Sequence, residues 1–377
     1  MKKIYFLVMA VVATLFVACS DTQTPATDTT KLYPAMDPSG EMWGYIDAKG
    51  NFVIPPMFDQ ATNFSCGYAR VILNDEIKFI DKKGKIQPTM SYDIASDFYH
   101  NYSTISLDDR MGLLGTNLSL AIQPYYYYLG LMGDNGLIAA LMDDDGKYQY
   151  VNAKGDIKIA PMFESADEFT NGVAIVTLGG KYGVINNKGD FTIQPTYKHR
   201  LWNMGAGLIG FNENDKMGFM DAHGNMIIPA MYANLSVVSD GLILCQGKTQ
   251  YGYLDTKGNI VIPEMYQYAT DFFEGCAWVQ QSNNSAIACI NKKNEVLFYL
   301  LKEEAPVTGF HNGLALIRTK TGFKYIDKKN NFIYTWSNEG GSYLFAPKKV
   351  QEQVQEQNDW VKSFDADMTV HFDSRKL

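Results

Sequence analysis

The sequence is poor in the residues and motifs that bind metals or carry out catalysis. It has five cysteines and five histidines among 377 residues. No two cysteines form a Cys-x-x-Cys pair and no histidine cluster accompanies them, which argues against a zinc site. The chain also lacks a phosphate-binding loop, a Gly-x-Gly-x-x-Gly turn, a His-Glu-x-x-His pair and a Gly-x-Ser-x-Gly elbow. We therefore expect no catalytic residues, no metal and no cofactor, and a protein that is not an enzyme.

Positive charge is also scarce. Lysine and arginine number 33 against 41 aspartates and glutamates, which gives a formal net charge of −8 at pH 7. A phosphate backbone repels such a chain, so nucleic acid is excluded as an expected partner. The 46% hydrophobic and 13% aromatic content is that of a folded protein rather than a disordered one.

The first residues follow the order of a secretory signal. Lys2 and Lys3 precede an uncharged run over residues 4–17, and Ala18 stands directly before Cys19. The run is too short and wrongly flanked for a membrane-spanning helix. The Ala–Cys junction resembles a lipobox, although Phe16 stands where leucine is usual. We predict that residues 1–18 are a lipoprotein signal peptide and that Cys19 carries a lipid, which anchors the protein to the outer membrane in the cell envelope. The alternative is an ordinary signal peptide with a chance cysteine.

Residues 19–32 are predicted to be a flexible tether. The stretch is rich in threonine and has almost no apolar residues, so it cannot offset the entropy of ordering. Asp28-Thr29-Thr30 resembles a bacterial O-glycosylation acceptor at Thr29, but a plain linker is the favoured interpretation.

Two of the remaining cysteines, Cys276 and Cys289, are equidistant from the polar stretch Ser282-Asn283. A symmetric hairpin tip there would place them opposite each other, and an oxidising compartment would allow a disulfide. Free buried thiols are the favoured interpretation, because connectivity cannot be read from sequence.

A tandem repeat dominates the rest of the chain. Trp43-Gly44-Tyr45-Ile46-Asp47, followed by Gly50 and Pro55, recurs closely at residues 251–263. Taking Gly44 as the anchor, about nine copies follow at gaps of 34 to 37 residues. Their anchors are Gly44, Lys78, Gly112, Gln149, Gly183, Gly218, Gly252, Ala288 and Lys324.

Each copy has the marks of a β-hairpin. A glycine or asparagine closes the turn in all copies but one, which has Leu118, and an Asp or Asn usually stands three residues earlier. This pair predicts a turn with a residue at positive φ, capped by the earlier side chain. A proline then predicts the end of the second strand. A large aromatic follows, as Phe58, Tyr92, Tyr126, Phe163, Tyr197, Tyr232 and Tyr266.

Short apolar segments that alternate with period two, broken by Pro and Gly, exclude a helical repeat of the same length. We predict an all-β chain with about three short strands per copy. The residues that define the repeat most clearly are Trp43, Gly44, Asp47, Gly50, Phe58, Gly183, Gly189, Tyr197, Gly218, Gly224, Tyr232, Gly252, Asp255, Gly258 and Tyr266.

These motifs resemble the bacterial WG-repeat family, with units close to Lys-Trp-Gly-Tyr-Ile-Asp-x-x-Gly, Ile-x-Pro-x-Tyr and Phe-x-x-Gly-x-Ala. The resemblance covers about residues 40–335, and together with the N-terminus it is Bacteroidetes-like. Only Trp43 keeps the tryptophan of the motif. The resemblance implies an exported or surface protein with an interaction role, and it supplies no catalytic residues.

One unit cannot bury its apolar face alone, so neighbouring units stack. With nine units of about three strands, we expect residues 33–337 to form an open, solenoid-like or superhelical β-array. The alternative is a β-propeller, which usually has four to eight four-stranded blades. Residues 338–377 are predicted to be a C-terminal cap with a helix at about 347–364, covering the last open sheet edge.

The aromatic column has two interpretations. A buried ladder between units is the favoured one, and a platform for sugars or peptides is the other. Tyr125, Tyr126, Tyr127 and Tyr128 form the best candidate platform, because alternation turns two of four rings outward. We therefore expect a non-enzymatic envelope lipoprotein whose repeat surface binds an unknown protein or glycan. An envelope spacer, or less readily a glycan-acting enzyme, is the alternative.

Overall fold

The computed structural model describes residues 30–337, and within this range every regular element is a β-strand. The 34 strands form nine separate sheets, in which neighbouring strands are consecutive along the chain and antiparallel. The all-β prediction is therefore confirmed. The described range has no helix that could cross a membrane.

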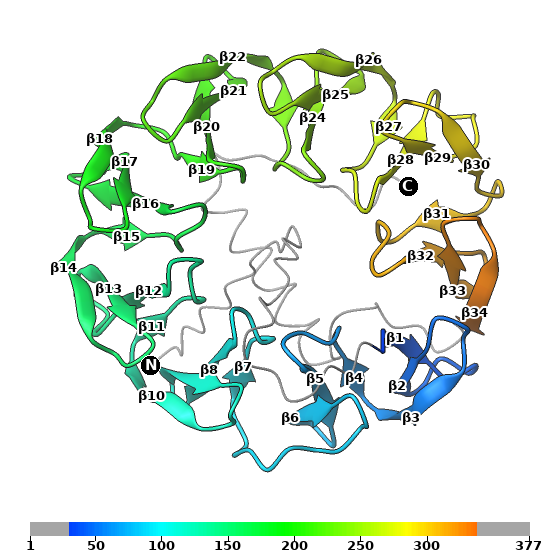
Figure 1. Cartoon of the computed structure of the whole chain (residues 1–377), viewed down its shortest axis with the longest axis horizontal. Helices are drawn as coiled ribbons and strands as arrows, with labels where there is room; N and C mark the ends of the chain where they lie inside the picture. Colours follow the sequence, from blue (N-terminus) through cyan, green and yellow to red (C-terminus); the bar gives the residue numbers. More distant parts are fainter. Residues whose placement is uncertain (1–29, 338–377) are drawn as a thin grey trace, which may run out of the picture.

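Each sheet is one blade of a ring, and we number the blades from 1 to 9 along the chain (Figure 1). Blade 1 contains β1 (Tyr33–Met36), β2 (Trp43–Ile46) and β3 (Phe52–Phe58), and blade 2 contains β4 (Gln60–Ala61), β5 (Tyr68–Leu73) and β6 (Glu76–Asp81). Blade 3 contains β7 (Ile94–Ala95), β8 (Tyr102–Leu107), β9 (Arg110–Gly115) and β10 (Leu120–Tyr126). Blade 4 contains β11 (Tyr128–Leu129), β12 (Leu137–Leu141), β13 (Tyr148–Asn152) and β14 (Ile157–Phe163).

The remaining blades all have four strands. Blade 5 contains β15 (Ser165–Ala166), β16 (Val173–Leu178), β17 (Lys181–Asn186) and β18 (Phe191–Tyr197), and blade 6 contains β19 (Trp202–Asn203), β20 (Leu208–Glu213), β21 (Lys216–Asp221) and β22 (Met226–Tyr232). Blade 7 contains β23 (Asn234–Leu235), β24 (Leu242–Gln246), β25 (Tyr251–Asp255) and β26 (Ile260–Tyr266), and blade 8 contains β27 (Tyr268–Ala269), β28 (Cys276–Gln280), β29 (Ala288–Asn291) and β30 (Val296–Tyr299). Blade 9 contains β31 (Ala305–Pro306), β32 (Leu314–Arg318), β33 (Gly322–Asp327) and β34 (Phe332–Ser337).

A four-stranded blade begins with a two-residue strand near the central opening and ends with a longer strand at the outer rim, as β19 and β22 show in Figure 1. The prediction of about three strands per copy therefore omitted the innermost strand. Two residues are too few to carry an alternating pattern, so this strand leaves no periodic signal in the sequence.

The anchor glycine lies where the outermost strand bulges over its neighbour. In blade 1, Tyr45 pairs with Ile54 and Trp43 pairs with Phe58, so extra residues of β3 stand opposite Gly44. A Cβ on Gly44 would lie 2.6 Å from the Ile54 oxygen. The strand continues through Pro55, so the prediction that proline ends the strand is wrong. Proline is tolerated because the bulge lies on an edge strand, where no ladder hydrogen bond is needed.

The hairpin turns have the residues that their geometry requires. Gly50 has φ +86°, and the Asp47 carboxylate accepts the backbone N–H groups of Lys49 and Asn51 at 2.8 and 3.0 Å. Leu118, the exception in this column, also has a positive φ of 62°. Its side chain packs against the core between blades 2 and 3, which offsets part of the backbone cost.

The core consists of nine clusters, and each cluster joins two neighbouring blades. The decisive cluster packs Tyr33, Ala35 and Ile46 of blade 1 against Leu316, Tyr325 and Trp336 of blade 9. The last blade therefore contacts the first, and the ring is closed (Figure 1).

The junction of blades 9 and 1, which we call the seam, is closed by tyrosine hydroxyls. In blades 1, 4 and 7 the core tyrosine donates to the first segment of the next blade, as Tyr253 does to the Thr270 oxygen at 2.7 Å. Blade 1 lacks such a segment among the described residues, and Tyr325 donates to Pro34 of β1 at 2.9 Å instead. Tyr334 donates to the Met36 oxygen at 3.0 Å. These bonds satisfy carbonyls on the inner edge of β1, and Pro34 has no N–H to leave exposed.

The prediction of an open solenoid-like array is wrong, and the structure is the alternative, a nine-bladed β-propeller. The error came from counting three strands per unit and from the usual limit of eight blades. The predicted signal peptide, Cys19, Thr29 and the C-terminal cap with its helix at 347–364 lie outside the described residues, as does most of the tether.

Candidate functional site

The hairpins that join the first and second strands of blades 2 to 9 reach toward the central opening (Figure 1). We call their turns the tips. Each tip ends in a residue with positive φ, and these residues are Gly67, Asn101, Gly136, Gly172, Gly207, Gly241, Gly275 and Gly313. Seven of the eight are glycine, so Asn101 in blade 3 is the departure from the rule.

Neighbouring tips are hydrogen-bonded to one another. The carboxylates of Asp134, Asp240 and Glu274 each accept the backbone N–H of the next tip, from Asn171, Gly275 and Gly313 respectively. Three pairs of neighbouring tips, those of blades 4 and 5, 7 and 8, and 8 and 9, are therefore linked along the inner rim.

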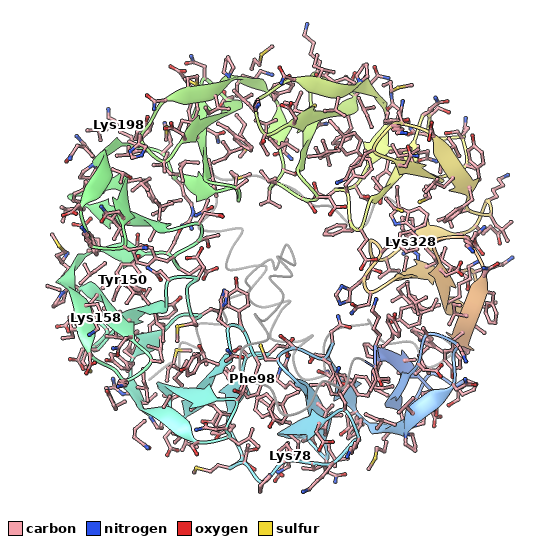
Figure 2. All side chains as sticks on the ribbon, in the orientation of Figure 1. Lys78, Phe98, Tyr150, Lys158, Lys198 and Lys328 are labelled. Carbon is pink, nitrogen blue, oxygen red and sulfur yellow. The ribbon has the colours of Figure 1, made fainter. Side chains whose placement is uncertain are left out.

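Two of these three carboxylates are neutralised by a lysine of the next blade, which lies in the turn between the last two strands of that blade. Glu274 pairs with Lys328 at 3.0 Å, and Asp240 pairs with Lys292 at 3.8 Å. Figure 2 shows Lys328 beside the opening, whereas Lys158 and Lys198 lie at the outer rim. The corresponding place beside blade 4 is taken by Asn187, which bonds Asn135. Among residues 30–337, Asp134 forms no ion pair.

A hollow of about 220 Å³ lies between the tips of blades 3 and 4. Its walls include His100, Asn101, Tyr102, Met132, Asp134 and Ala153. The residues come from two tips and from the turn between β13 and β14, so the frame of the rim shapes the hollow. None of them was singled out from the sequence. Asn101, at a tip position where the other copies have glycine, was the sequence signal that could have pointed to this hollow.

His100 is the most unusual residue of this hollow. It has φ +48°, as the equivalent residues of most tips do, but it is followed by Asn101 with φ +70°, where those tips have glycine. The Nε2 atom of His100 is buried without a hydrogen-bond partner in the described structure. The Tyr99 ring lies across the imidazole, with ring centroids 4.3 Å apart.

The electrostatics keep both rings neutral near neutral pH. Burial lowers the pKa of His100, and the Asp134 carboxylate partly offsets this effect. Burial also raises the pKa of the Tyr99 hydroxyl, and the Glu168 and Asp134 carboxylates raise it further. The walls of the hollow thus offer a carboxylate without a cationic partner and a neutral imidazole against which the Tyr99 ring lies, and such polar groups pair with ligand hydroxyls.

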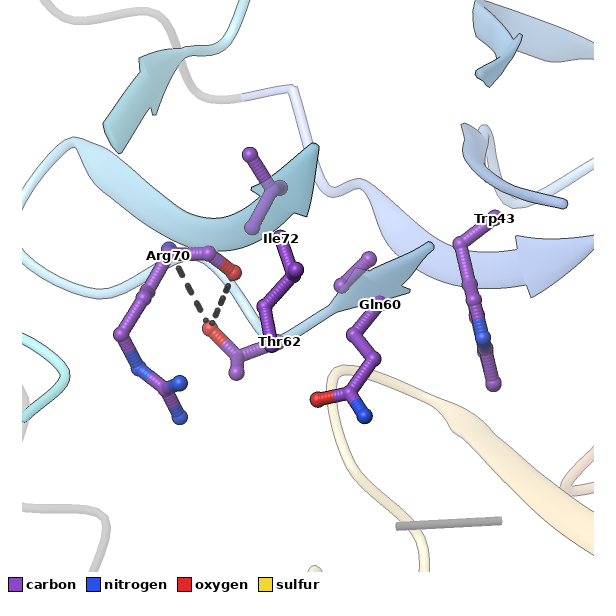
Figure 3. Close-up of a pocket in the computed structure, with 7 residues that line it drawn as sticks. Trp43, Gln60, Thr62, Arg70 and Ile72 are labelled. Atoms are coloured by element: carbon purple, nitrogen blue, oxygen red, sulfur yellow. Dashed lines mark hydrogen bonds between the residues drawn. The ribbon is translucent and has the colours of Figure 1, made fainter. Parts of the chain in front are cut away.

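A second, smaller cavity of about 90 Å³ lies between blades 1 and 2. Figure 3 shows Trp43 on one side and Gln60, Thr62 and Arg70 on the other. The Thr62 hydroxyl bonds the backbone of Arg70, and the Arg70 guanidinium is engaged by Asp97 at 3.0 Å. This cavity has less than half the volume of the hollow between blades 3 and 4, and its Thr62 and Arg70 side chains already have partners.

The structure separates the four tyrosines that the sequence grouped as a platform. Tyr126 is fully buried between blades 3 and 4, whereas Tyr125 is 44% exposed. Tyr127 is half-buried and bonds Asp144, and Tyr128 packs edge-on against Tyr148 with centroids 5.6 Å apart. Only Tyr125 presents a large exposed surface, so these residues do not form one continuous aromatic face.

Cys245, Cys276 and Cys289 are free and buried. Cys276 pairs with Asn291 and Cys289 pairs with Trp278 in the ladder, so the two thiols are diagonal neighbours rather than opposite each other. They are hydrogen-bonded, which lowers the pKa of Cys276 and raises that of Cys289. The described range contains no group of three or more side chains that could hold a metal ion.

The fold and the rim define a repeat β-propeller, and comparison with known proteins agrees. The family model of the WG containing repeat matches residues 43–76, 150–182, 182–216, 217–244 and 251–284, so such repeats occur across the chain. No curated protein matches the sequence.

Three solved structures illustrate the similarity of fold. A crystal structure described as the eukaryotic initiation factor has a TM-score of 0.59 at 12% identity, over 82% of this chain and 96% of that chain. Porphyromonas gingivalis dipeptidyl peptidase 4 has a TM-score of 0.45 at 8% identity, over 88% and 60%. Dihydro-heme d1 dehydrogenase NirN in complex with DHE has a TM-score of 0.43 at 10% identity, over 84% and 75%. At such identities only the first is informative, and it shows the fold alone.

Proposed function

We propose that this protein is a non-enzymatic, lipid-anchored protein of the cell envelope whose propeller binds a glycan or protein at the rim of tips. A repeat β-propeller suggests a binding or scaffold role. The observation that carries the proposal is the hollow between blades 3 and 4. There the tip departs from glycine, His100 has an unpaired buried nitrogen, and Asp134 lacks an ion pair.

The repetition of the fold supports binding rather than catalysis. Equivalent positions in the other blades are filled by structural turns, and the carboxylates of blades 7 and 8 are neutralised by lysines. The tip of blade 3, which lacks glycine, therefore lies beside polar groups that the fold leaves unused. The proposed anchor is supported by Cys19 directly after the signal-like segment.

The binding role is tested with the purified full-length chain in detergent, screened on a glycan array and by crosslinking to envelope proteins. The comparison variant replaces the tip Tyr99-His100-Asn101 by Ser-Asp-Gly, the turn that blade 7 uses at Ser239-Asp240-Gly241. We expect a ligand that the variant no longer binds although its circular dichroism is unchanged. A ligand bound equally by both chains would place recognition elsewhere and contradict the proposal.

The anchor is tested separately by the mass of the protein purified from membranes of a lipoprotein-processing bacterium. A lipid mass on a chain that begins at Cys19, and its loss in Cys19→Ala, are expected. An unmodified cysteine in a processed chain would leave an ordinary exported protein.

A further inference from the structure

The polar groups of the hollow between blades 3 and 4 indicate the chemistry of its ligand, and the inference rests on the proposed binding role. The hollow lies between two tips that are fixed to their neighbours, and Asp134 is the residue that links it to blade 5. A site of this kind is preformed, so it recognises a ligand by the positions of its donors and acceptors.

Asp134 supplies a carboxylate that the fold leaves partly unused. One oxygen accepts the Asn171 N–H, as the equivalent oxygens of Asp240 and Glu274 accept theirs. The lysines that neutralise Asp240 and Glu274 have no counterpart at Asp134, where Asn187 stands and bonds Asn135 instead. An ionised carboxylate makes strong, charge-assisted hydrogen bonds to hydroxyl donors.

His100 supplies the second polar contact. Its Nε2 atom is buried without a partner, and a buried polar atom without a partner costs about 1–3 kcal/mol until a ligand satisfies it. A neutral imidazole either donates or accepts at that nitrogen, according to its tautomer. A hydroxyl group fits both cases because it also donates and accepts.

The remaining walls suit the carbon skeleton of a sugar. Tyr102, Met132 and Ala153 give the hollow apolar surface beside its polar groups. Its volume of about 220 Å³ lies below the ~300–1,000 Å³ of sites for drug-sized ligands. We propose that this hollow binds one neutral pyranose residue of a glycan, with Asp134 accepting from sugar hydroxyls and His100 pairing with another hydroxyl.

The charges of the site set its selectivity. The carboxylates of Asp134 and Glu168 both raise the pKa of Tyr99, so Asp134 is not the sole source of negative charge near this tip. An anionic sugar such as glucuronate is repelled. A protonated amine is attracted to Asp134, but it offers donors only, so it cannot accept from the His100 imidazole when Nε2 carries the proton.

The test titrates the full-length chain with methyl glycosides of glucose, galactose, mannose and N-acetylglucosamine, with glucuronate, and with lysine amide as the probe for a peptide side chain. Binding is followed by ligand-detected NMR and calorimetry. We expect at least one neutral glycoside to bind with a Kd of about 1 mM, the range for a single small residue. Glucuronate and lysine amide should bind at least tenfold more weakly.

Two variants with matched controls locate the site. Asp134→Asn should weaken the glycoside at least tenfold, whereas Asp240→Asn should leave it unchanged, although both residues hold the next tip. Ala153→Met should abolish binding by filling the hollow, whereas Ala222→Met, at the same place in the turn of blade 6, should not.

Four results would overturn the inference: no neutral glycoside binding at 50-fold the expected Kd, preferential binding of lysine amide, equal losses in Asp134→Asn and Asp240→Asn, or full binding by Ala153→Met. The binding role itself fails only if the wild-type chain and the tip-exchange variant behave alike toward intact glycans and envelope proteins. A protein ligand that the tip exchange abolishes, with no sugar bound, would retain the role and reject the sugar.

Discussion

Replacing Gly252 by alanine should damage blade 7 through a backbone contact rather than through conformational strain. A Cβ at this position would lie 2.6 Å from the Ile262 oxygen, 2.7 Å from the Glu264 nitrogen and 2.8 Å from the Pro263 carbonyl carbon. These are backbone atoms of β26, so relief requires the edge strand to move outward and lose ladder contacts. We expect Gly252→Ala to cost about 2–3 kcal/mol, the upper part of the usual overpacking range.

Two other substitutions separate the clash from other effects. Gly275→Ala adds a Cβ that meets nothing within 4 Å but forces φ +83°, so it should cost about 1 kcal/mol. Ala288 occupies the anchor position in blade 8, where the outermost strand pairs without the proline bulge. Ala288→Gly should therefore destabilise by about 0.5–1 kcal/mol through added chain entropy, not stabilise.

The assay is urea-induced unfolding followed by circular dichroism, with midpoints compared at equal slope. A Gly252→Ala variant no less stable than Gly275→Ala, or an Ala288→Gly variant more stable than the wild-type chain, would contradict the clash with β26. Blade 4 limits the cost that can be expected. There Gln149 occupies the anchor position opposite a bulge of the same register, so the fold can accommodate a side chain at this place.

Two further predictions concern the seam and a buried acid. Tyr325→Phe leaves the Pro34 oxygen without its donor and should cost about 1 kcal/mol of unfolding free energy, whereas Tyr299→Phe, at a 59% exposed ring, should change nothing measurable. Burial raises the pKa of Asp271, whose Oδ1 has no partner, so the folded chain binds that proton more readily than the unfolded chain. Asp271→Asn should therefore raise stability by about 1 kcal/mol at neutral pH, and urea midpoints should show the gain vanish as the pH falls through the raised pKa. A gain that persists at low pH would contradict this assignment.

The sequence predicts the strands whose side chains alternate and the turns whose backbone requires particular residues. The positive φ of Gly50 and the Asp47 bonds to its turn are local, so the residues that make them are recognisable from their spacing. The all-β class follows from the same local signals.

Closure of the ring could not be predicted, because it depends on residues nearly 300 positions apart. Tyr325 and Pro34 meet only when nine small rotations between blades add up to a full turn. No single repeat encodes that sum. The innermost strands were missed for a simpler reason, since two residues such as Ser165–Ala166 carry no period.

The hollow that we propose as the site was not predicted, because the sequence analysis sought exposed aromatic residues. Tyr125 to Tyr128 are conspicuous in the sequence, but in the fold Tyr125 is exposed, Tyr126 is buried and Tyr128 packs against another ring. His100 and Asp134 lie 34 residues apart, on separate tips, and become neighbours only through the stacking of blades 3 and 4. Asn101 was visible as the one tip without glycine, but its importance depends on the hollow beside it.

The closed ring is tested most directly by two spin-label distances in the full-length chain, with labels attached through an introduced keto amino acid. The first pair is at Lys49 and Lys329, which are exposed and occupy equivalent turn positions in blades 1 and 9. The reference pair is at Lys257 and Lys293, the same positions in the adjacent blades 7 and 8. The closed nine-bladed ring predicts that the two pairs give matching distance distributions by double electron–electron resonance. A distance across the seam that is much longer than the reference distance would contradict closure and restore an open array.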